Sequence, residues 1–425
     1  MSNPAWYEDG KVNEVLFCRA FLAEHPMRCM GGQLCTVTGP VEDEEVVKLQ
    51  ILSLLEPWIT TGLAKKCSTL LDVLKLRTYC EPMPPDLGSI HVANGVYRLV
   101  GGFEPVLDYC NNRLAVRYDP AAPAPVRWLR FLDELLEPED VLTLQEYLGY
   151  CLIPSTKGQK MMLILGKGGE GKSRIGLVMR DILGSSMNTG SIQKIENNRF
   201  ARADLQGKLL LVDDDMDMNA LPKTNYLKSI ITAESKMDIE RKGVQSVQCQ
   251  LYARFLCFGN GALTSLYDQS RGFYRRQLIL TTKDRPPDRV DDPFLTEKLR
   301  SEVEGIFLWC LEGLHRLLAN NYRFTVSART NENLESIQRS SNNILEFLSS
   351  TGYIRFRADG MISSRELFAL YKQWCEDNTC HSLSASRLSS ELAQNEQKYN
   401  VEATNNIYLP GGKRVRGFVG IEADQ

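Results

Sequence analysis

The sequence lacks the long apolar run that a membrane-spanning protein needs. None of its 425 residues belongs to an apolar stretch approaching the roughly 18 to 20 residues that cross a bilayer. The N-terminus also lacks a basic stretch followed by an apolar one, so we expect no secretory signal. These absences predict a cytoplasmic protein with no membrane partner.

The sequence also lacks the cysteine spacing of a structural metal site. Its 12 cysteines are scattered, and no two of them form a Cys-x-x-Cys pair. Cys29 and Cys35 could form half of a zinc site. The same is true of Cys375 and Cys380, which His381 follows. Because neither pair has a second half at the usual ligand spacing, we expect reduced, mostly buried thiols and no structural metal.

An excess of positive charge is absent as well. The formal net charge is −3, and the hydrophobic (43%) and charged (24%) fractions are ordinary for a soluble globular protein. The sequence therefore does not predict a protein coated in positive charge for nonspecific DNA binding. If nucleic acid is a partner, its basic contacts must be gathered locally, for example inside a ring.

The apolar pattern divides the first part of the chain into two regions. The first, residues 1–85, is predicted to be mainly helical with one strand. Its helices are expected near 13–23, 42–55 and 67–76, its strand within 31–39 and a linker at 81–88. The second region, residues 86–150, is predicted to contain short strands at 91–99, a turn at 119–125 and a helix at 138–150.

The rest of the chain predicts a core and a tail. In residues 151–330 apolar strands alternate with helices, which is typical of a parallel α/β sheet. Residues 335–425 are predicted to contain three helices, at 341–350, 363–378 and 384–397, and then two strands, at 406–409 and 415–421. Three helices followed by a two-stranded wing suggest a winged-helix domain. The expected fold class is therefore α/β with a C-terminal winged helix.

A glycine-rich loop with the sequence GKGGEGKS lies between a buried strand and a helix. The strand is 161–165, the loop runs from Gly166 to Ser173, and the helix follows from 174. This is the strand–GxxxxGK[ST]–helix arrangement of a P-loop. Glycines let the backbone N–H groups wrap the phosphates closely, and the helix N-terminus adds partial positive charge.

Each residue of this loop is a candidate ligand of a nucleoside triphosphate. We expect Lys172 to neutralise the β- and γ-phosphates and Ser173 to bind Mg²⁺ through its hydroxyl. The remaining candidates act through their backbone: Gly166, Lys167, Gly168, Gly169, Glu170 and Gly171. A chain with this loop is predicted to be an NTPase.

Three consecutive aspartates follow a second apolar strand. The strand at 207–212 runs into Asp213, Asp214 and Asp215. We expect it to neighbour the strand of the glycine-rich loop, so that one carboxylate holds Mg²⁺ and another polarises the attacking water. Buried carboxylates in a row need a cation, although a solvated turn is the alternative. The spacing leaves open which two of the three act.

Two further polar residues stand beside later strands. Asn260 ends the strand at 253–260 and could orient the water, although Asn-Gly is also a common turn. Arg276, after Arg275, precedes the strand at 277–280 and could stabilise transition-state charge on a neighbour's γ-phosphate. That role requires an oligomer, and either arginine of the pair could fill it. A surface basic pair is the alternative.

With these elements in order, the chain resembles the superfamily 3 helicases, in particular the phage/plasmid primase P4 family and the poxvirus D5-like group. Segments 93–99, 116–120 and 144–150 look like the helical D5 N-terminal region that precedes the ATPase. The ATPase motifs are matched by 207–217 (Walker B), 227–235 with 239–243 (motif B′), 258–260 (motif C) and 273–276 (arginine finger). The tail is similar to the winged-helix domain of these proteins.

The resemblance implies an AAA+-like core and a ring, usually a hexamer, that uses ATP to unwind DNA. Its Walker B register favours Asp214 and Asp215 over Asp213, with Asp214 on the Mg²⁺. The motif B′ segment would form a loop or hairpin in the channel, where Lys236, Arg241 and Lys242 would grip single-stranded or forked DNA. The resemblance also implies a phage or mobile element in a bacterial host.

The chain departs from many of these relatives in its first 85 residues. Many relatives have a primase domain before the ATPase, but these 85 residues contain neither the acidic metal triad nor the zinc pattern of a primase. We therefore expect a separate primase partner. Two other functions remain open. One is an ATP-dependent replication initiator or loader that binds DNA but unwinds little. The other is a packaging or remodelling ATPase, although the tail lacks the spaced carboxylates of a nuclease.

Overall fold

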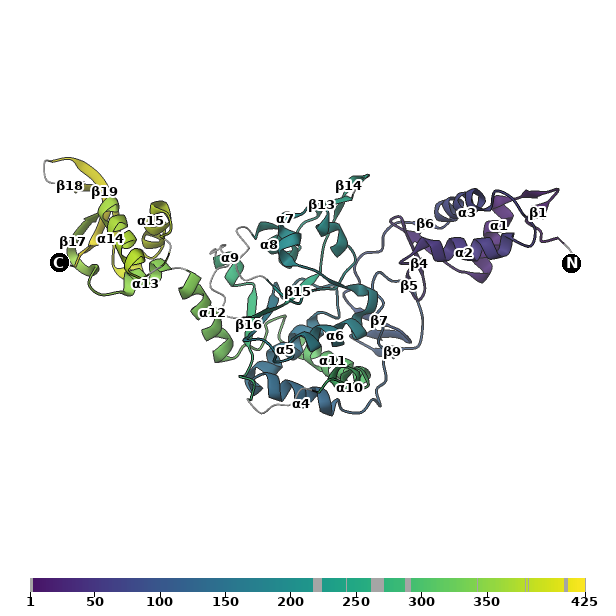
Figure 1. Cartoon of the computed structure of the whole chain (residues 1–425), viewed down its shortest axis with the longest axis horizontal. Coiled ribbons are helices and arrows are strands. Elements are labelled where there is room, and N and C mark those ends of the chain that lie inside the picture. Colours follow the sequence, from purple (N-terminus) through teal and green to yellow (C-terminus); the bar gives the residue numbers. More distant parts are fainter. Residues whose placement is uncertain are drawn as a thin grey trace. The chain divides into compact units, whose positions relative to one another are not determined.

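The computed structural model describes residues 3–216, 224–241, 243–260, 271–286, 292–341, 343–378, 380, 382–408 and 412–424 (Figure 1). The chain divides into two compact units. The larger unit comprises Met1–Asp217, Lys223–Gly261 and Arg275–Asn331, and the smaller unit comprises Met218–Pro222, Ala262–Tyr274 and Glu332–Gln425. Helices and strands are mixed throughout, which confirms the α/β class.

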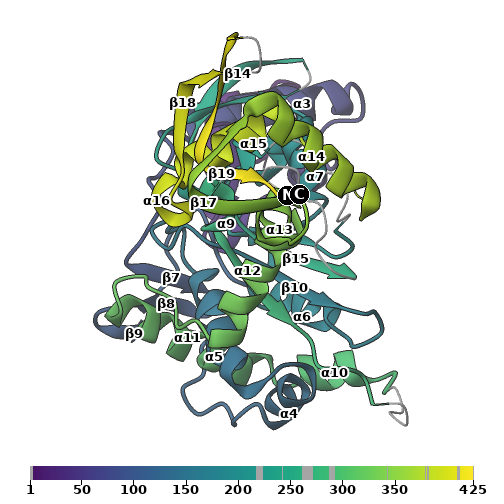
Figure 2. The ribbon, with the colours of Figure 1, turned by 90° about the vertical axis from the view of Figure 1, so that its left-hand side faces the viewer.

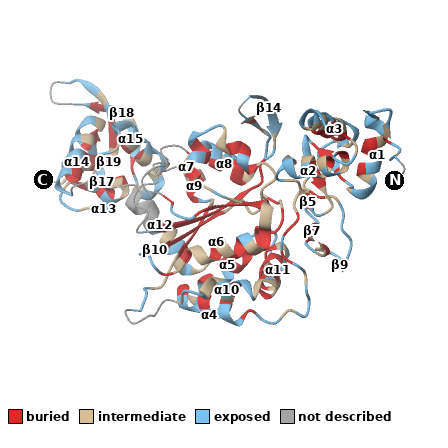
Figure 3. Ribbon diagram, turned by 45° about the vertical axis from the view of Figure 1, so that its right-hand side comes forward, coloured by how far each residue is buried: buried red, intermediate tan, exposed pale blue. Residues whose placement is uncertain are grey.

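Within the described residues, five parallel strands form the central sheet of the larger unit. Their order is β11–β12–β15–β10–β16. The strands are β10 (Met161–Gly166), β11 (Met187–Thr189), β12 (Leu210–Asp213), β15 (Arg254–Asn260) and β16 (Gln277–Thr281). Most of their residues are buried on both faces of the sheet, which is why these strands appear in the sequence as continuous apolar runs (Figure 3).

The lateral order of the strands contradicts one expectation. The acidic strand β12 does not neighbour β10, because β15 lies between them and pairs with both. At roughly 4.8 Å per strand, β12 and β10 are about 10 Å apart. Hydrophobic periodicity identifies strands along the chain but carries no information on their order in the sheet.

Helices cover both faces of the central sheet (Figure 3). On one face α6 (Ser173–Leu183) lies so close that a Cβ on Gly176 would stand 3.1 Å from Val212 of β12. On the other face lie α7 (Ile192–Asn197) and α8 (Asn225–Thr232). The remaining short elements of this part are η1 (Gly184–Ser186), η2 (Ala201–Leu205), β13 (Met237–Arg241), β14 (Val244–Cys249) and α10 (Leu295–Arg300). The short helix α9 (Arg271–Tyr274) belongs to the smaller unit.

Two helices pack backbone to backbone beneath the sheet. They are α5 (Pro138–Tyr150), which the sequence predicts with the same limits, and α11 (Val303–Ala319). A Cβ on Gly149 would stand 2.3 Å from the Cys310 carbonyl oxygen, and a Cβ on Gly313 would stand 2.3 Å from that of Gln145. Glycine is therefore needed at both positions for the two helices to meet.

The N-terminal region has a hydrophobic core of its own, formed by residues between Trp6 and Leu74. The predicted helices are present, and the predicted strand is β4, which follows a Gly31-Gly32 turn with φ of 56° and 88°. The preceding strand β3 was not predicted. The elements are β1 (Tyr7–Glu8), β2 (Lys11–Val12), α1 (Glu14–Glu24), β3 (Arg28–Met30), β4 (Gln33–Thr36), β5 (Gly39–Pro40), α2 (Glu44–Leu55), α3 (Leu63–Arg77) and β6 (Tyr79–Cys80).

The following region is only partly helical. An antiparallel sheet of β7 (Ser89–Val92), β8 (Gly95–Arg98) and β9 (Gly102–Glu104) precedes α4 (Val126–Leu135) and α5. Ile90, Trp128 and Leu144 share one hydrophobic core with residues of the central sheet such as Ile164. The region therefore folds together with the central sheet.

The smaller unit contains the three predicted helices and the predicted strand pair, together with a strand that the sequence did not predict. The helix α12, which begins at Ala328 in the larger unit, was not predicted either. The sheet of the smaller unit has the antiparallel order β17–β19–β18, and Figure 2 shows β18 and β19 side by side as a long hairpin. The missed strand is β17, which is largely exposed and interrupted by an irregularity in its pairing. The elements are α12 (Ala328–Ser341), α13 (Asn343–Ser349), β17 (Ile354–Ser363), α14 (Ser364–Asp377), α15 (Ala385–Gln394), α16 (Glu396–Tyr399), β18 (Glu402–Tyr408) and β19 (Arg414–Ala423).

Two expectations from the whole sequence concern membrane-spanning helices and the state of the cysteines. Among the described residues, no helix is both long and apolar enough to cross a membrane. All 12 cysteines are free thiols, and most of them are buried, as the scattered spacing predicts.

Candidate active site

The glycine-rich loop connects the end of β10 to the start of α6, at the carboxyl edge of the sheet. Gly168, Gly169 and Gly171 have φ of 104°, 82° and 95°. Residues with a side chain rarely adopt this left-handed backbone, so these glycines are required by the course of the loop. Ser173 is the first residue of α6 and is half-buried. The loop therefore places the Ser173 hydroxyl and several backbone N–H groups at the N-terminus of α6.

Lys172 and Glu170 are buried together inside this loop. The Lys172 side chain is 6% exposed, and its Nζ donates to Glu170 Oε2 at 2.8 Å. Glu170 Oε1 accepts the backbone N–H groups of Lys167 at 2.5 Å and of Gly168 at 2.8 Å. Burial raises the pKa of Glu170, but the bonds from Lys172 and the loop amides outweigh it and hold that pKa below its ordinary value. The lysine thus faces a carboxylate rather than solvent.

Asn260 contacts the same lysine from the neighbouring strand. It ends β15 directly beside Gly166, which ends β10, because the two residues are partners in the parallel register. Asn260 Oδ1 accepts a hydrogen bond from Lys172 Nζ at 3.2 Å. The structure therefore brings together the predicted lysine and the predicted asparagine.

The three aspartates fall into two groups. Asp213 is buried, and its Oδ2 accepts the backbone N–H of Ile192 at 2.8 Å, where α7 begins. Burial raises the pKa of Asp213, and bonds from the N–H groups of Ile192 and Asp215 partly oppose that rise. Asp214 and Asp215 are exposed in the turn that follows β12. The buried carboxylate thus supports α7, while the two exposed ones lie at the edge of the sheet that carries the glycine-rich loop.

Arg276 lies at the amino ends of the parallel strands, whereas the glycine-rich loop of the same chain lies at their carboxyl ends. It immediately precedes β16, and its carbonyl accepts the N–H of Met161, the first residue of β10, at 2.8 Å. The loop begins at the other end of β10, roughly 17 Å away at 3.3 Å per residue. Arg276 is half-buried, whereas Arg275 is exposed. Burial, and to a smaller extent Arg275, lowers the pKa of the Arg276 guanidinium.

Two of the three predicted DNA-contacting residues, Lys236 and Arg241, lie beside or on a β-hairpin formed by β13 and β14. Lys236 is exposed just before β13, and Arg241 ends that strand with Nη2 donating to Gln206 Oε1 at 2.9 Å. Lys242 lies outside the described residues, as does Asp217 of the Walker B match. The hairpin also carries acids, and one of them, Glu240, pairs with Arg199 at 3.1 Å.

The chain is similar in fold to the C-terminal region of NrS-1. The apo structure of that region (305-718) has 11% identity and a TM-score of 0.58, and the match covers 97% of this chain and 100% of that one. Two A-form apo structures give 10% identity and 0.54, covering 95% and 98%, and 12% and 0.55, covering 96% and 99%. At such identities the likeness concerns the fold alone.

Sequence comparison gives a shorter match. The family model described as "Family of unknown function (DUF5906)" matches residues 164–276. That segment contains the whole loop together with the aspartates, Asn260 and Arg276. No curated protein matches the chain.

One charged residue near the loop was not singled out from the sequence. Arg285 follows β16, and its Nη1 donates to the carbonyl of Gly169 at 3.4 Å. It lies in a run of charged residues that looks like an ordinary surface segment. Only the lateral order of the sheet, with β16 beside β10, shows that residues after β16 reach the loop.

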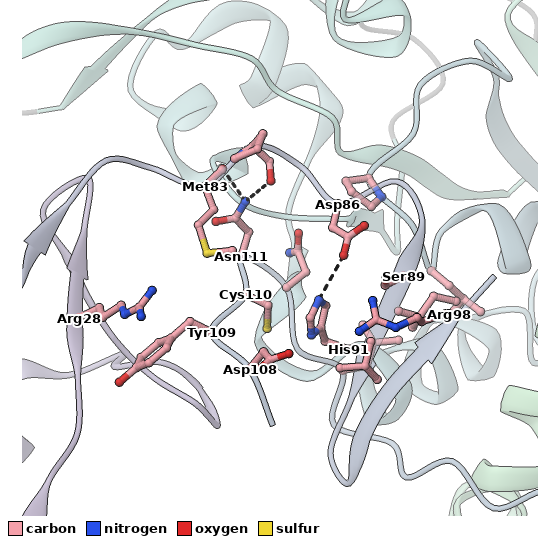
Figure 4. A pocket seen from close by; sticks show the side chains of 17 residues that line it. Arg28, Met83, Asp86, Ser89, His91, Arg98, Asp108, Tyr109, Cys110 and Asn111 are labelled. Atoms are coloured by element: carbon pink, nitrogen blue, oxygen red, sulfur yellow. Dashed lines mark hydrogen bonds and ion pairs between the residues drawn. The ribbon is translucent and has the colours of Figure 1, made fainter. Parts of the chain in front are cut away.

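A separate cavity of about 400 Å³ lies between β7, β8 and the segment 108–112 (Figure 4). Two of its charged groups have ionic partners: His91 Nε2 and Asp86 Oδ2, both in the wall, are 3.4 Å apart, and Arg98 pairs at 2.7 Å with Glu104, which does not line the cavity. Burial lowers the pKa of His91, with Asp86 partly opposing it. The wall also contains Arg28 and Asp108, so it carries charges of both signs and does not select a ligand of one charge.

Proposed function

We propose that this chain is an ATP-dependent DNA helicase of superfamily 3 that acts in the replication of phage or mobile-element DNA. The observation that carries the proposal is the convergence on one sheet edge of the glycine-rich loop, Lys172 and Asn260, with the exposed Asp214 and Asp215 two strands away. An AAA+-like core and a C-terminal winged helix are the finer forms of the fold that we propose with it. A likeness in fold to the NrS-1 C-terminal region supports the overall architecture.

The residues of the loop fit a nucleoside triphosphate bound with Mg²⁺. Positive-φ glycines bring N–H groups to the inner side of the loop, and Lys172 supplies a buried ammonium. Ser173 and Asp214 would hold Mg²⁺, since side-chain oxygens are its preferred protein ligands. A bound Mg²⁺ would neutralise charge on the β- and γ-phosphates.

The chain's own polar groups have distinct roles in this proposal. Asp215 would accept a proton from the attacking water, and Asn260 would orient that water, since its Oδ1 already lies 3.2 Å from Lys172 Nζ. Asp213 has no part in this chemistry, because its carboxylate holds the start of α7. The burial of Asp213 and the exposure of its two neighbours support our assignment of the chemical roles to Asp214 and Asp215.

Hydrolysis would require a second copy of the chain. Arg276 is at the far edge of the sheet from its own loop, so an arginine finger at this position would act on the nucleotide of a neighbouring subunit. We therefore propose a homo-oligomeric ring, with a hexamer as the expected size. Lys236, Arg241 and Lys242 would contact DNA in its channel, and a separate primase would supply priming.

Strand displacement tests the proposal. The purified chain, with ATP and Mg²⁺, is mixed with a fluorescently labelled DNA fork, and release of one strand is followed over time. We expect displacement with ATP and none with a non-hydrolysable analogue. Hydrolysis that DNA stimulates without any displacement would instead identify a replication initiator or loader. Absence of both hydrolysis and displacement would refute the proposal.

A further inference from the structure

The glycine-rich loop already holds an anion, and that anion is part of the loop. The Glu170 carboxylate accepts two backbone N–H groups, at 2.5 and 2.8 Å, and the Lys172 ammonium at 2.8 Å. Backbone N–H groups and a lysine are the donors that a P-loop offers to phosphate oxygens. The side chain of Glu170 therefore occupies donors that a bound triphosphate would use.

This placement differs from that of an ordinary loop acid. In the same segment Lys167 pairs with Asp284 at 2.7 Å, and both side chains are about four-fifths exposed, at 80% and 78%. An ion pair exposed to solvent in this way contributes little to the stability of the fold. Glu170 is 3% exposed, so its charge is compensated by the loop donors rather than by water.

The backbone of the loop is shaped to admit this carboxylate. A Cβ on Gly166 would stand 2.7 Å from Glu170 Oε1 and 2.5 Å from Thr282 Oγ1. Glycine at 166 is thus what lets the glutamate fold back onto the N–H groups of residues 167 and 168. A P-loop needs glycine so that its backbone can approach phosphate, and here the glycine at 166 makes room for the Glu170 side chain.

We propose that Glu170 competes with the nucleotide: in the nucleotide-free chain its carboxylate holds Lys172 and the loop amides, and a triphosphate must displace it to bind. This inference rests on the proposed function. Only the fraction of molecules in which Glu170 has left the loop is competent to bind, so the apparent affinity is reduced by that fraction. Removing the carboxylate charge removes this competition.

The test is the affinity of the full chain for a non-hydrolysable ATP analogue with Mg²⁺, measured by calorimetry for the wild type, Glu170→Gln and Glu170→Ala. Glutamine keeps the shape but not the charge, and alanine removes the group. We expect both variants to bind about tenfold more tightly or better, as the loss of charge-assisted hydrogen bonds predicts. Asp284→Asn is the matched control, because it removes one negative charge that lies beside the loop but in solvent. It should change the affinity less than about twofold, and any effect should fade with salt.

The outcomes separate the two claims. If the wild type binds the analogue and both Glu170 variants bind it equally or more weakly, the competition is refuted and the proposed function stands. If Asp284→Asn tightens binding as much as Glu170→Gln does, the effect is general electrostatics and the competition is again refuted. If no form of the chain binds the analogue, the proposed function fails and this inference fails with it.

Discussion

At the scale of single residues, the aspartates at 213–215 show how neighbouring identical side chains acquire different roles. Asp213 is buried and accepts the N–H of Ile192. Asp214 and Asp215 are exposed at the edge of the sheet. Their proximity in sequence conceals this division, because Asp213 is the last residue of the buried strand β12 and the other two lie in the turn beyond it.

Substitution by asparagine should separate the three positions. Asp213→Asn keeps an oxygen that can accept the Ile192 N–H and removes a buried charge, so we expect ATP hydrolysis close to wild type and a melting temperature that is equal or higher. Asp214→Asn and Asp215→Asn should each reduce hydrolysis by about 100-fold or more, since they remove a metal ligand and a general base. Steady-state phosphate release and thermal melting are the measurements. Loss of hydrolysis in Asp213→Asn at unchanged stability would contradict the assignment.

The sequence predicted most members of this site but not their mutual arrangement. The loop, Lys172 and Asn260 were predicted because each ends an apolar strand or fits a fixed spacing. The inward fold of Glu170 was not predicted, since it depends on the conformation of the loop backbone. The approach of Arg285 was not predicted either, since it depends on which strands lie side by side. The notion that β12 neighbours β10 was wrong for the same reason.

At the scale of elements, the contact between α5 and α11 depends on two glycines that the sequence pattern gives no reason to notice. The helical periodicity of 138–150 predicts α5 and its limits. It does not predict that Gly149 would place a Cβ 2.3 Å from a backbone oxygen of α11. The helical periodicity thus identifies α5, whereas its close contact with α11 is seen only in the folded chain.

Replacing Gly149 by valine should therefore destabilise the larger unit. The added atoms meet backbone rather than a flexible side chain, and overpacking of this kind costs about 1–3 kcal/mol. Chemical denaturation of the full chain measures the change. Gly88→Val is the control, because a Cβ at this exposed position meets only Asp86 Oδ1, at an ordinary 3.7 Å, and the backbone is not left-handed. A loss of stability at Gly149 no greater than at Gly88 would contradict the close contact.

Substitution of the two arginines before β16 gives a second prediction at this scale. Arg276→Ala should retain nucleotide binding and lose hydrolysis by about 1,000-fold, within the range known for arginine fingers. The exposed Arg275→Ala is the matched control and should remain active. Mixing Arg276→Ala with Lys172→Ala subunits should restore part of the activity, because each inactive subunit supplies what the other lacks. If the mixture stays inactive while both variants assemble, the arginine does not act across an interface.

At the scale of the whole molecule, the net charge of −3 has to be reconciled with a nucleic-acid partner. The β13–β14 hairpin carries the candidate contacts, but it also carries Glu240, which pairs with Arg199. One hairpin is therefore a weak site, and a ring would multiply it. The resemblance to the superfamily 3 helicases implied a loop or hairpin here, and the structure contains a hairpin without testing its partner.

Salt dependence measures the hairpin's part in DNA binding. Lys236→Ala should weaken the binding of single-stranded DNA and lower the slope of log K against log salt by about 1, if one phosphate contact is lost. Lys65→Ala, an exposed lysine on α3, should leave the slope unchanged. Fluorescence anisotropy at several salt concentrations gives both slopes. Equal slopes for Lys236→Ala and wild type would remove Lys236 from the DNA path.

The most direct test of the whole account is phosphate release from ATP by the wild type and by Lys172→Ala, purified side by side. Lys172 contacts both Glu170 of the loop and Asn260 of the neighbouring strand, so these two parts of the proposed site meet at this side chain. We expect Mg²⁺-dependent release by the wild type and a loss of about 100-fold or more in the variant, at a similar melting temperature. Equal release by the two proteins would contradict the claim that this loop hydrolyses a nucleoside triphosphate.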